Sequence, residues 1–283
     1  MDAKEDGTEM LAGFLIGLRE GLEAALIVGL VLGILTQMKQ ERNRNVIWAG
    51  VAAAIVLSLA AAGILRWLGT SLEGTAEEIF EGAMMLLAAG VLTWMIFWMQ
   101  RQGRTYQIGL ESNVRRAMQS GQVWALFGIA FIAVLREGIE TALFLTATAM
   151  VADERQVFMG AVLGIAAAVM LGWVLFSATI RLNLRRFFLV TSFLLILFAA
   201  GLFAHGVHEF VEAGWLPAFI DPIWNLNPIL DESSLTGSIL KALFGYNGNP
   251  SLTESLAYVL YLAVILLGIR WLARKSANPP RVT

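Results

Sequence analysis

The chain has 283 residues, of which 58% are hydrophobic and only 15% are charged, and its mean hydropathy is +0.69. Several runs of 18 or more mostly apolar residues predict a multi-pass membrane protein with lipid as its surroundings and no nucleic-acid partner. The chain contains no cysteine, which excludes disulfides, thiolate metal sites and iron–sulfur clusters.

Seven segments are long and apolar enough to cross a membrane as helices. The expected fold is therefore an all-α polytopic membrane protein with a single transmembrane domain over residues 1–283. Residues 104–119 are expected to form a separate short cytoplasmic helix, and residues 213–252 a long outer loop. The approximate spans are 10–36, 46–68, 76–99, 122–151, 156–180, 187–212 and 253–273.

The charges between these spans alternate in sign along the chain. Basic residues follow the first, third, fifth and seventh spans, whereas acidic residues follow the second, fourth and sixth. Because basic segments stay in the cytoplasm, the N-terminus is expected outside and the C-terminus inside. The outer face is then an acidic surface, which would concentrate cations.

One short motif occurs in the first span and again in the fourth. Arg19-Glu20-Gly21-Leu22-Glu23 lies in the first, and Arg136-Glu137-Gly138-Ile139-Glu140 in the fourth. A charged side chain in mid-bilayer costs about 2.5–3.5 kcal/mol, so six of them indicate function. On a helix the two glutamates of each motif are i,i+3 neighbours and the arginine reaches the second glutamate at i+4. Each motif therefore presents two carboxylates and one guanidinium on one face.

The first three spans (about 10–99) and the next three (about 122–212) are predicted to be two copies of one unit. Ala49-Gly50 resembles Met159-Gly160 at the same place in the second copy. Since three is an odd number, the second copy is inverted across the membrane, and inverted repeats place substrate sites near the midplane. The two motifs can then meet in antiparallel fashion, and helix 7 (about 253–273) has no counterpart. Glycines at i,i+4 spacing in the first span (Gly13, Gly17 and Gly21) predict close approach by another helix.

The paired motifs have the chemistry of a cation site. Four carboxylates and two guanidiniums sum to −2 when all are ionised. Carboxylates are hard ligands, which suit Fe³⁺, Mn²⁺, Mg²⁺ or Ca²⁺, with Fe²⁺ also acceptable. The alternative, in which each arginine forms a structural ion pair with the second glutamate, leaves Glu20 and Glu137 unexplained.

A second cluster of candidate ligands lies at the outer end of the sixth span. Its residues recur at i, i+3, i+4 and i+7, which is one helical face, and acidic residues at the start of the third span are expected on the same side. The cluster is predicted to capture metal before the midplane site, and the alternative is a solvated polar helix end. A haem site is disfavoured because both histidines lie on one helix face. The residues are His205, His208, Glu209 and Glu212, with Glu77, Glu78 and Glu81.

These residues carry a resemblance to the oxidase-dependent iron permease family, which includes fungal high-affinity iron permeases and bacterial EfeU-type permeases. The two Arg-Glu-Gly-x-Glu motifs at inverted-repeat positions are its strongest signal. Further matches cover nearly the whole chain, among them Glu78-Ile79-Phe80-Glu81-Gly82, Arg181-Leu182-Asn183-Leu184, Glu212-Ala213-Gly214 and Leu243-Phe244-Gly245-Tyr246.

The resemblance implies an iron transporter rather than an enzyme, in a bacterial cytoplasmic membrane, with iron as substrate and no haem or organic cofactor. It implies that the motif glutamates ligate iron, with Arg19 and Arg136 as their charge partners. It also implies ferric iron supplied by separate periplasmic iron-binding or oxidase proteins, one of them peroxidase-like. The residues themselves leave three alternatives open: Fe²⁺ rather than Fe³⁺ as substrate, a transporter of another cation such as Mn²⁺ or protons, and a membrane di-metal redox enzyme.

Overall fold

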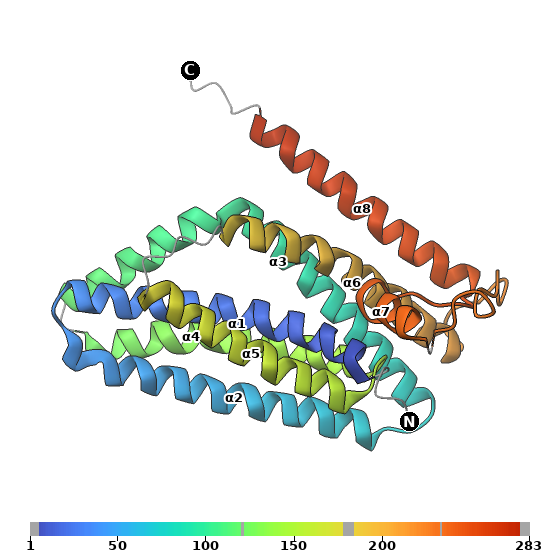
Figure 1. The fold of residues 1–283 in the computed structure, drawn as a ribbon, viewed down its shortest axis with the longest axis horizontal. Helices are drawn as coiled ribbons and strands as arrows, with labels where there is room; N and C mark the ends of the chain where they lie inside the picture. Colours follow the sequence, from blue (N-terminus) through green and yellow to red (C-terminus); the bar gives the residue numbers. More distant parts are fainter. Residues whose placement is uncertain (1–5, 120–121, 178–183, 233, 278–283) are drawn as a thin grey trace. The chain divides into compact units, whose positions relative to one another are not determined.

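The structure, a computed structural model, describes residues 6–119, 122–177, 184–232 and 234–277, and all regular elements in these ranges are helices (Figure 1). Long apolar helices are expected here, because a membrane-embedded chain must satisfy its backbone hydrogen bonds internally. The elements are α1 (Asp6–Gln37), η1 (Glu41–Asn43), α2 (Arg44–Ser71), α3 (Thr75–Gln119), α4 (Val123–Ala149), α5 (Glu154–Ser177), α6 (Leu184–Glu212), α7 (Leu235–Phe244) and α8 (Leu252–Ala277).

Five helical segments within the described ranges are long and apolar enough to span a membrane. They are well suited to lipid, since large apolar side chains such as Val56, Val162 and Leu260 are more than half exposed on them. This confirms the all-α, multi-pass character, while the count of seven spans and their orientation stay predictions. The five segments are Glu41–Ser71, Thr75–Trp98, Glu154–Leu175, Leu189–Glu212 and Leu252–Trp271.

Two elements differ from the sequence prediction. The separate helix expected at 104–119 is instead the continuation of α3, one helix of 45 residues. No proline interrupts residues 75–119, so the backbone can continue without a break. The predicted outer loop contains a further helix, α7. Its N-cap Ser234 accepts a hydrogen bond from the Gly237 amide, and Gly245 ends it in the left-handed conformation, with φ of 66°.

The helices form two compact units. Unit 1 comprises residues 1–73 and 101–191, and unit 2 comprises residues 74–100 and 192–283. In unit 1, α1 packs along α5, α2 packs along α4, and α1 also contacts α4. In unit 2, the first part of α3 packs against α6 where Gly82 meets Gly206. Both units therefore combine helices from the two predicted repeats.

Glycines set the close packing of α1 on α5. A Cβ atom on Gly17 would lie 2.5 Å from the carbonyl oxygen of Ala161, and Gly13 meets Val157 in the same way one turn earlier. Since the contacts advance along both helices together, α1 and α5 run in the same direction. The predicted approach of another helix to the glycine stripe is thus confirmed, and the helix is α5. Small residues at such a crossing let the backbones come close enough for van der Waals packing to hold the pair.

Candidate metal centre

The two motifs meet inside unit 1, where α1 and α4 contact each other. Their charged side chains are withdrawn from the surface. Glu20, Glu137 and Glu140 are buried and Glu23 is half-buried, whereas Arg19 is completely buried and Arg136 is partly exposed. Charged groups are almost never buried unless they are paired or hold an ion, so this arrangement needs partners.

The glycine within each motif marks the place where a neighbouring helix crosses. A Cβ atom on Gly21 would lie 2.8 Å from the Cβ atom of Ala168 on α5. A Cβ atom on Gly138 would lie 2.7 Å from the Cβ atom of Ser58 on α2. A larger residue at either position would push its helix partner away. The motif glycines therefore let α5 and α2 support the two helices that carry the carboxylates.

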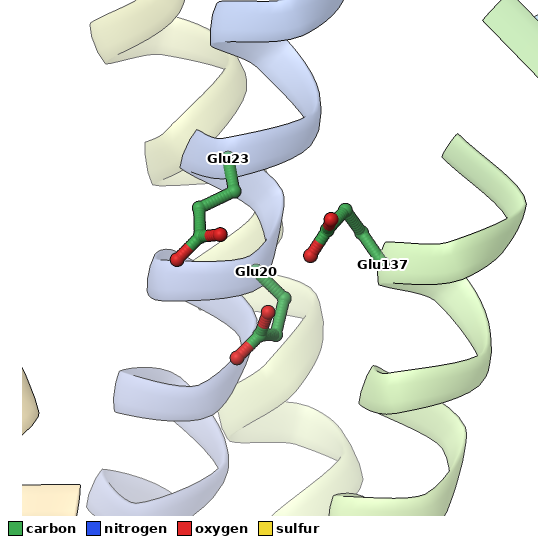
Figure 2. Close-up of side chains that lie close together, drawn as sticks. All are labelled: Glu20, Glu23 and Glu137. Atoms are coloured by element: carbon green, nitrogen blue, oxygen red, sulfur yellow. The ribbon is translucent and has the colours of Figure 1, made fainter. Parts of the chain in front are cut away.

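Three carboxylates from the two motifs converge. One oxygen from each of Glu20, Glu23 and Glu137 lies within 4.8 Å of the other two (Figure 2). Figure 2 shows the α1 pair and Glu137 of α4 reaching toward a common space between the helices. This separation allows three oxygens to contact one cation, because hard cations are held by oxygen ligands at about 2.0–2.6 Å.

Several carboxylate oxygens of the two motifs are free to bind a ligand. Oε2 of Glu20, of Glu137 and of Glu140 is buried and has no hydrogen-bond partner in the structure. An unsatisfied buried acceptor costs about 1–3 kcal/mol, and more when it is charged. A cation bound among the converging carboxylates would remove that cost at Glu20 and Glu137, which both belong to that group.

The arginines are ion-paired within their own motifs. The Nη1 atom of Arg19 lies 2.5 Å from Glu20 and its Nη2 atom 3.0 Å from Glu23. Arg136 contacts Glu140 at 2.8 Å and Glu137 at 3.7 Å through Nε. The predicted i,i+4 pairs are therefore present, and in addition each arginine contacts the first glutamate. Glu140, the fourth motif glutamate, lies outside the converging group of three.

The second predicted cluster lies in unit 2, at the N-terminal end of α3 and the C-terminal end of α6. The two helices pack against each other there, as expected. The ring of His208 lies 3.3 Å from Glu212, while Nδ1 of His205 lies 3.1 Å from the backbone oxygen of Gly201. Glu77 and Glu212 are exposed, and Glu78, Glu81 and Glu209 are half-buried. In the part of the chain that the structure describes, these residues do not bring three ligand atoms within 4.8 Å, and metal capture here stays a prediction.

Sequence reasoning missed Glu254 of α8, which it assigned only to a capping box with Ser251. The cap exists, since the Ser251 hydroxyl accepts a hydrogen bond from the Glu254 amide at 3.2 Å. The carboxylate, however, is buried and accepts two hydrogen bonds from Asn247 at 2.9 and 3.0 Å. It also lies 3.7 Å from Nδ1 of His208. The Asn-Gly-Asn-Pro turn seven residues earlier is the single hint of this role in the sequence.

Known proteins resemble this chain over most of its length. The chain is 38% identical over 274 residues to the ferrous iron permease EfeU of Escherichia coli O6:H1, covering 96% of this chain and 99% of the relative. It is 35% identical over 260 residues to the ferrous iron permease EfeU of Yersinia pestis, covering 91% and 92%. No solved structure matches the chain. The model of the iron permease FTR1 family matches residues 10–279, and the chain belongs to this family.

Proposed function

We propose that this chain carries iron across the bacterial cytoplasmic membrane into the cell and binds it between α1 and α4. The observation that supports this is the convergence of Glu20, Glu23 and Glu137, together with buried carboxylate oxygens that lack hydrogen-bond partners. The all-oxygen ligand set suits a hard cation. Arg19 and Arg136 balance the carboxylates in the empty site and become neighbours of the ligands when iron enters.

The proposed topology has seven spans, with the N-terminus outside, the C-terminus inside and two inverted three-helix repeats. It requires α1 and α5 to run one way and α2 and α4 the other. The glycine contacts support this, because α1 follows α5 in parallel and Gly50 and Gly138 place α2 parallel to α4. Each of these helices packs along a helix of the other repeat, α1 along α5 and α2 along α4. Two intertwined repeats would produce this pairing.

The absence of cysteine makes the orientation directly testable. Asp153→Cys, between α4 and α5, is expected to react with a membrane-impermeant maleimide in intact cells. Arg42→Cys, between α1 and α2, is expected to react only after the membrane is opened. The reverse pattern would contradict the orientation, and reaction of both residues in intact cells would contradict the number of spans between them.

The form of iron is part of the proposal. The relatives are named ferrous iron permeases, which favours Fe²⁺ as the ion presented to this chain. The same carboxylates can hold Fe³⁺, which would have to be supplied by separate periplasmic iron-binding or oxidase proteins. These partners remain part of the proposal and enter the experiment as added components.

The deciding experiment is uptake by proteoliposomes that contain the purified full chain. Fe²⁺ under reducing conditions and chelated Fe³⁺ are supplied separately, with Mn²⁺ as competitor and the Glu20→Gln variant as control. Two results together would support an iron permease: the Glu20→Gln variant takes up no iron, and excess Mn²⁺ does not suppress iron uptake by the unmodified chain. Equal transport of Mn²⁺ would favour a general divalent-cation transporter. Iron-dependent oxidase activity without uptake, with or without candidate partners, would overturn the proposal in favour of a redox enzyme.

A further inference from the structure

A groove of about 600 Å³ lies on unit 1, apart from the carboxylates of the motifs. It lies where the C-terminal part of α2 meets the beginning of α5. Three of its lining residues are charged: Arg66 on α2, and Glu154 and Arg155 at the start of α5. Nη1 of Arg66 lies 2.5 Å from Glu154, and both side chains remain well exposed. The charged end of the groove thus carries two guanidiniums and one carboxylate.

The rest of the groove is apolar and follows α5 away from these charges. Its lining residues are Phe158, Met159, Val162 and Leu163, at i, i+1, i+4 and i+5 spacing, which keeps them on one side of the helix. Met159, Val162 and Leu163 are at least half exposed. From Arg155 to Leu163 the helix rises about 12 Å, at 1.5 Å per residue. The groove therefore changes from charged to apolar along its length.

We propose that this groove binds a membrane phospholipid, with its phosphate on Arg66 and Arg155 and an acyl chain along the apolar residues of α5. Guanidinium groups bind phosphate through parallel hydrogen bonds, and Arg66 keeps further donors beyond the one that faces Glu154. Glu154 can accept hydrogen bonds from the ammonium of a phosphatidylethanolamine headgroup. A second copy of the chain would not account for the order of charged and apolar residues, which matches that of a lipid.

The orientation of the groove agrees with the proposed topology. Arg66 lies near the end of α2 and Glu154 begins α5, and both ends are assigned to the outer surface. The headgroup would then lie at the outer surface of the cytoplasmic membrane. The acyl chain would point toward the bilayer centre, as it does for a lipid of the outer leaflet.

A lipid in this groove would connect the two helix pairs that carry the motifs. The Arg66–Glu154 ion pair already links α2, which supports α4 at Gly138, to α5, which supports α1 at Gly17 and Gly21. A phosphate on Arg66 and Arg155 adds a second link between the same helices. We therefore expect bound phospholipid to stabilise unit 1 as a whole.

The test uses the purified full chain in detergent, stripped of lipid, and measures thermal unfolding. Addition of phosphatidylethanolamine or phosphatidylglycerol is expected to raise Tm by roughly 5 °C at saturation. Diacylglycerol with the same acyl chains, which lacks phosphate, and inorganic phosphate alone are each expected to give much smaller shifts. The double variant Arg66→Gln/Arg155→Gln should lose most of the phospholipid response. The matched control Arg42→Gln/Arg44→Gln, in η1 and at the start of α2, should keep it.

A second variant distinguishes loss of lipid binding from a folding defect of the arginine double variant. Val162→Trp fills the apolar part of the groove and leaves both arginines in place, and it should also lose most of the response while its Tm without lipid stays near that of the unmodified chain. An equal response from the arginine double variant and its control, or from diacylglycerol and phospholipid, would overturn the proposal. Glu137→Gln should abolish iron uptake but keep the lipid response, so failure of the transport proposal and failure of the lipid proposal are distinguishable.

Discussion

Glu20 of α1 and Glu137 of α4 are both buried, and an oxygen of one lies within 4.8 Å of an oxygen of the other. Two carboxylates at this distance in a poorly solvated site repel each other when both are ionised. A cation between them converts the repulsion into attraction at both atoms. The relationship joins two segments that are far apart in the sequence, and the function proposed here depends on it.

Replacing Glu137 with glutamine tests this relationship. The change keeps the volume of the side chain but removes the charge and one anionic ligand. Loss of an outer-shell partner at a metal site lowers metal affinity by roughly 10–100-fold. Glu137 is a proposed direct ligand, so we expect iron affinity to fall by at least this much in a titration of the purified protein. Glu73→Gln, at an exposed glutamate, is the matched control and should bind iron normally. Unchanged affinity of Glu137→Gln would remove this residue from the site.

Arg19→Lys should impair uptake and stability more than Arg136→Lys. Arg19 is completely buried and contacts Glu20 and Glu23 through different nitrogen atoms, whereas Arg136 is partly exposed. A lysine ammonium does not reproduce this forked contact, so one charged hydrogen bond worth about 1.5–3 kcal/mol is lost. Thermal unfolding and iron uptake of the two variants, measured side by side, check the order. Equal losses would show that the difference in burial has no energetic consequence.

Gly17→Ala should destabilise the protein, although alanine is the better helix former. The added Cβ atom would lie 2.5 Å from the Ala161 carbonyl oxygen on α5, and such overpacking costs about 1–3 kcal/mol. Gly33→Ala on the same helix is the matched control, since no atom lies within 4 Å of its new Cβ atom. It should stabilise the protein by about 0.5–1 kcal/mol. Shifts of Tm in opposite directions are the expected result, and a rise in both would contradict the close packing of α1 on α5.

Gly138→Ala should lower iron uptake, and a change on α2 should restore part of it. The new Cβ atom would overlap the side chain of Ser58, whose own Cβ atom lies 2.7 Å away. The variant Ser58→Gly removes that side chain, so the double variant should transport more iron than Gly138→Ala alone. Uptake assays of the two single variants and the double variant measure this coupling. Purely additive losses would argue against direct contact between the two positions.

Glu254→Ala should loosen the segment between α6 and α8. Its carboxylate accepts two hydrogen bonds from Asn247, and hydrogen bonds to charged groups contribute about 1.5–3 kcal/mol. Limited proteolysis should therefore cut residues 213–252 faster in this variant, while Asp221→Asn, at an exposed acidic residue, should behave like the unmodified chain. Equal cleavage rates would show that other contacts hold this segment.

Much of the fold could be predicted because membrane helices follow from local sequence. Runs of apolar residues determine where the helices lie, and the ends of α2, α4 and α6 agree with the prediction to within a few residues. The extent of α3 and the presence of α7 were not predicted. The second half of α3 carries few apolar residues, and its helical state follows from backbone continuity. The ten residues of α7 are too few to span a membrane, and its ends are set by capping at Ser234 and Gly245.

The sequence by itself determined which side chains form the candidate site, because two buried Arg-Glu-Gly-x-Glu motifs are too costly in a membrane to be incidental. Helical spacing also placed Arg19 beside Glu23 and Arg136 beside Glu140. Only the tertiary structure decided which carboxylates converge, because the distance between Glu20 and Glu137 depends on how α1 and α4 pack on α5 and α2. It likewise decided that Glu254 binds Asn247, since an i,i+3 pattern at a helix start predicts a cap but not the direction in which the carboxylate points.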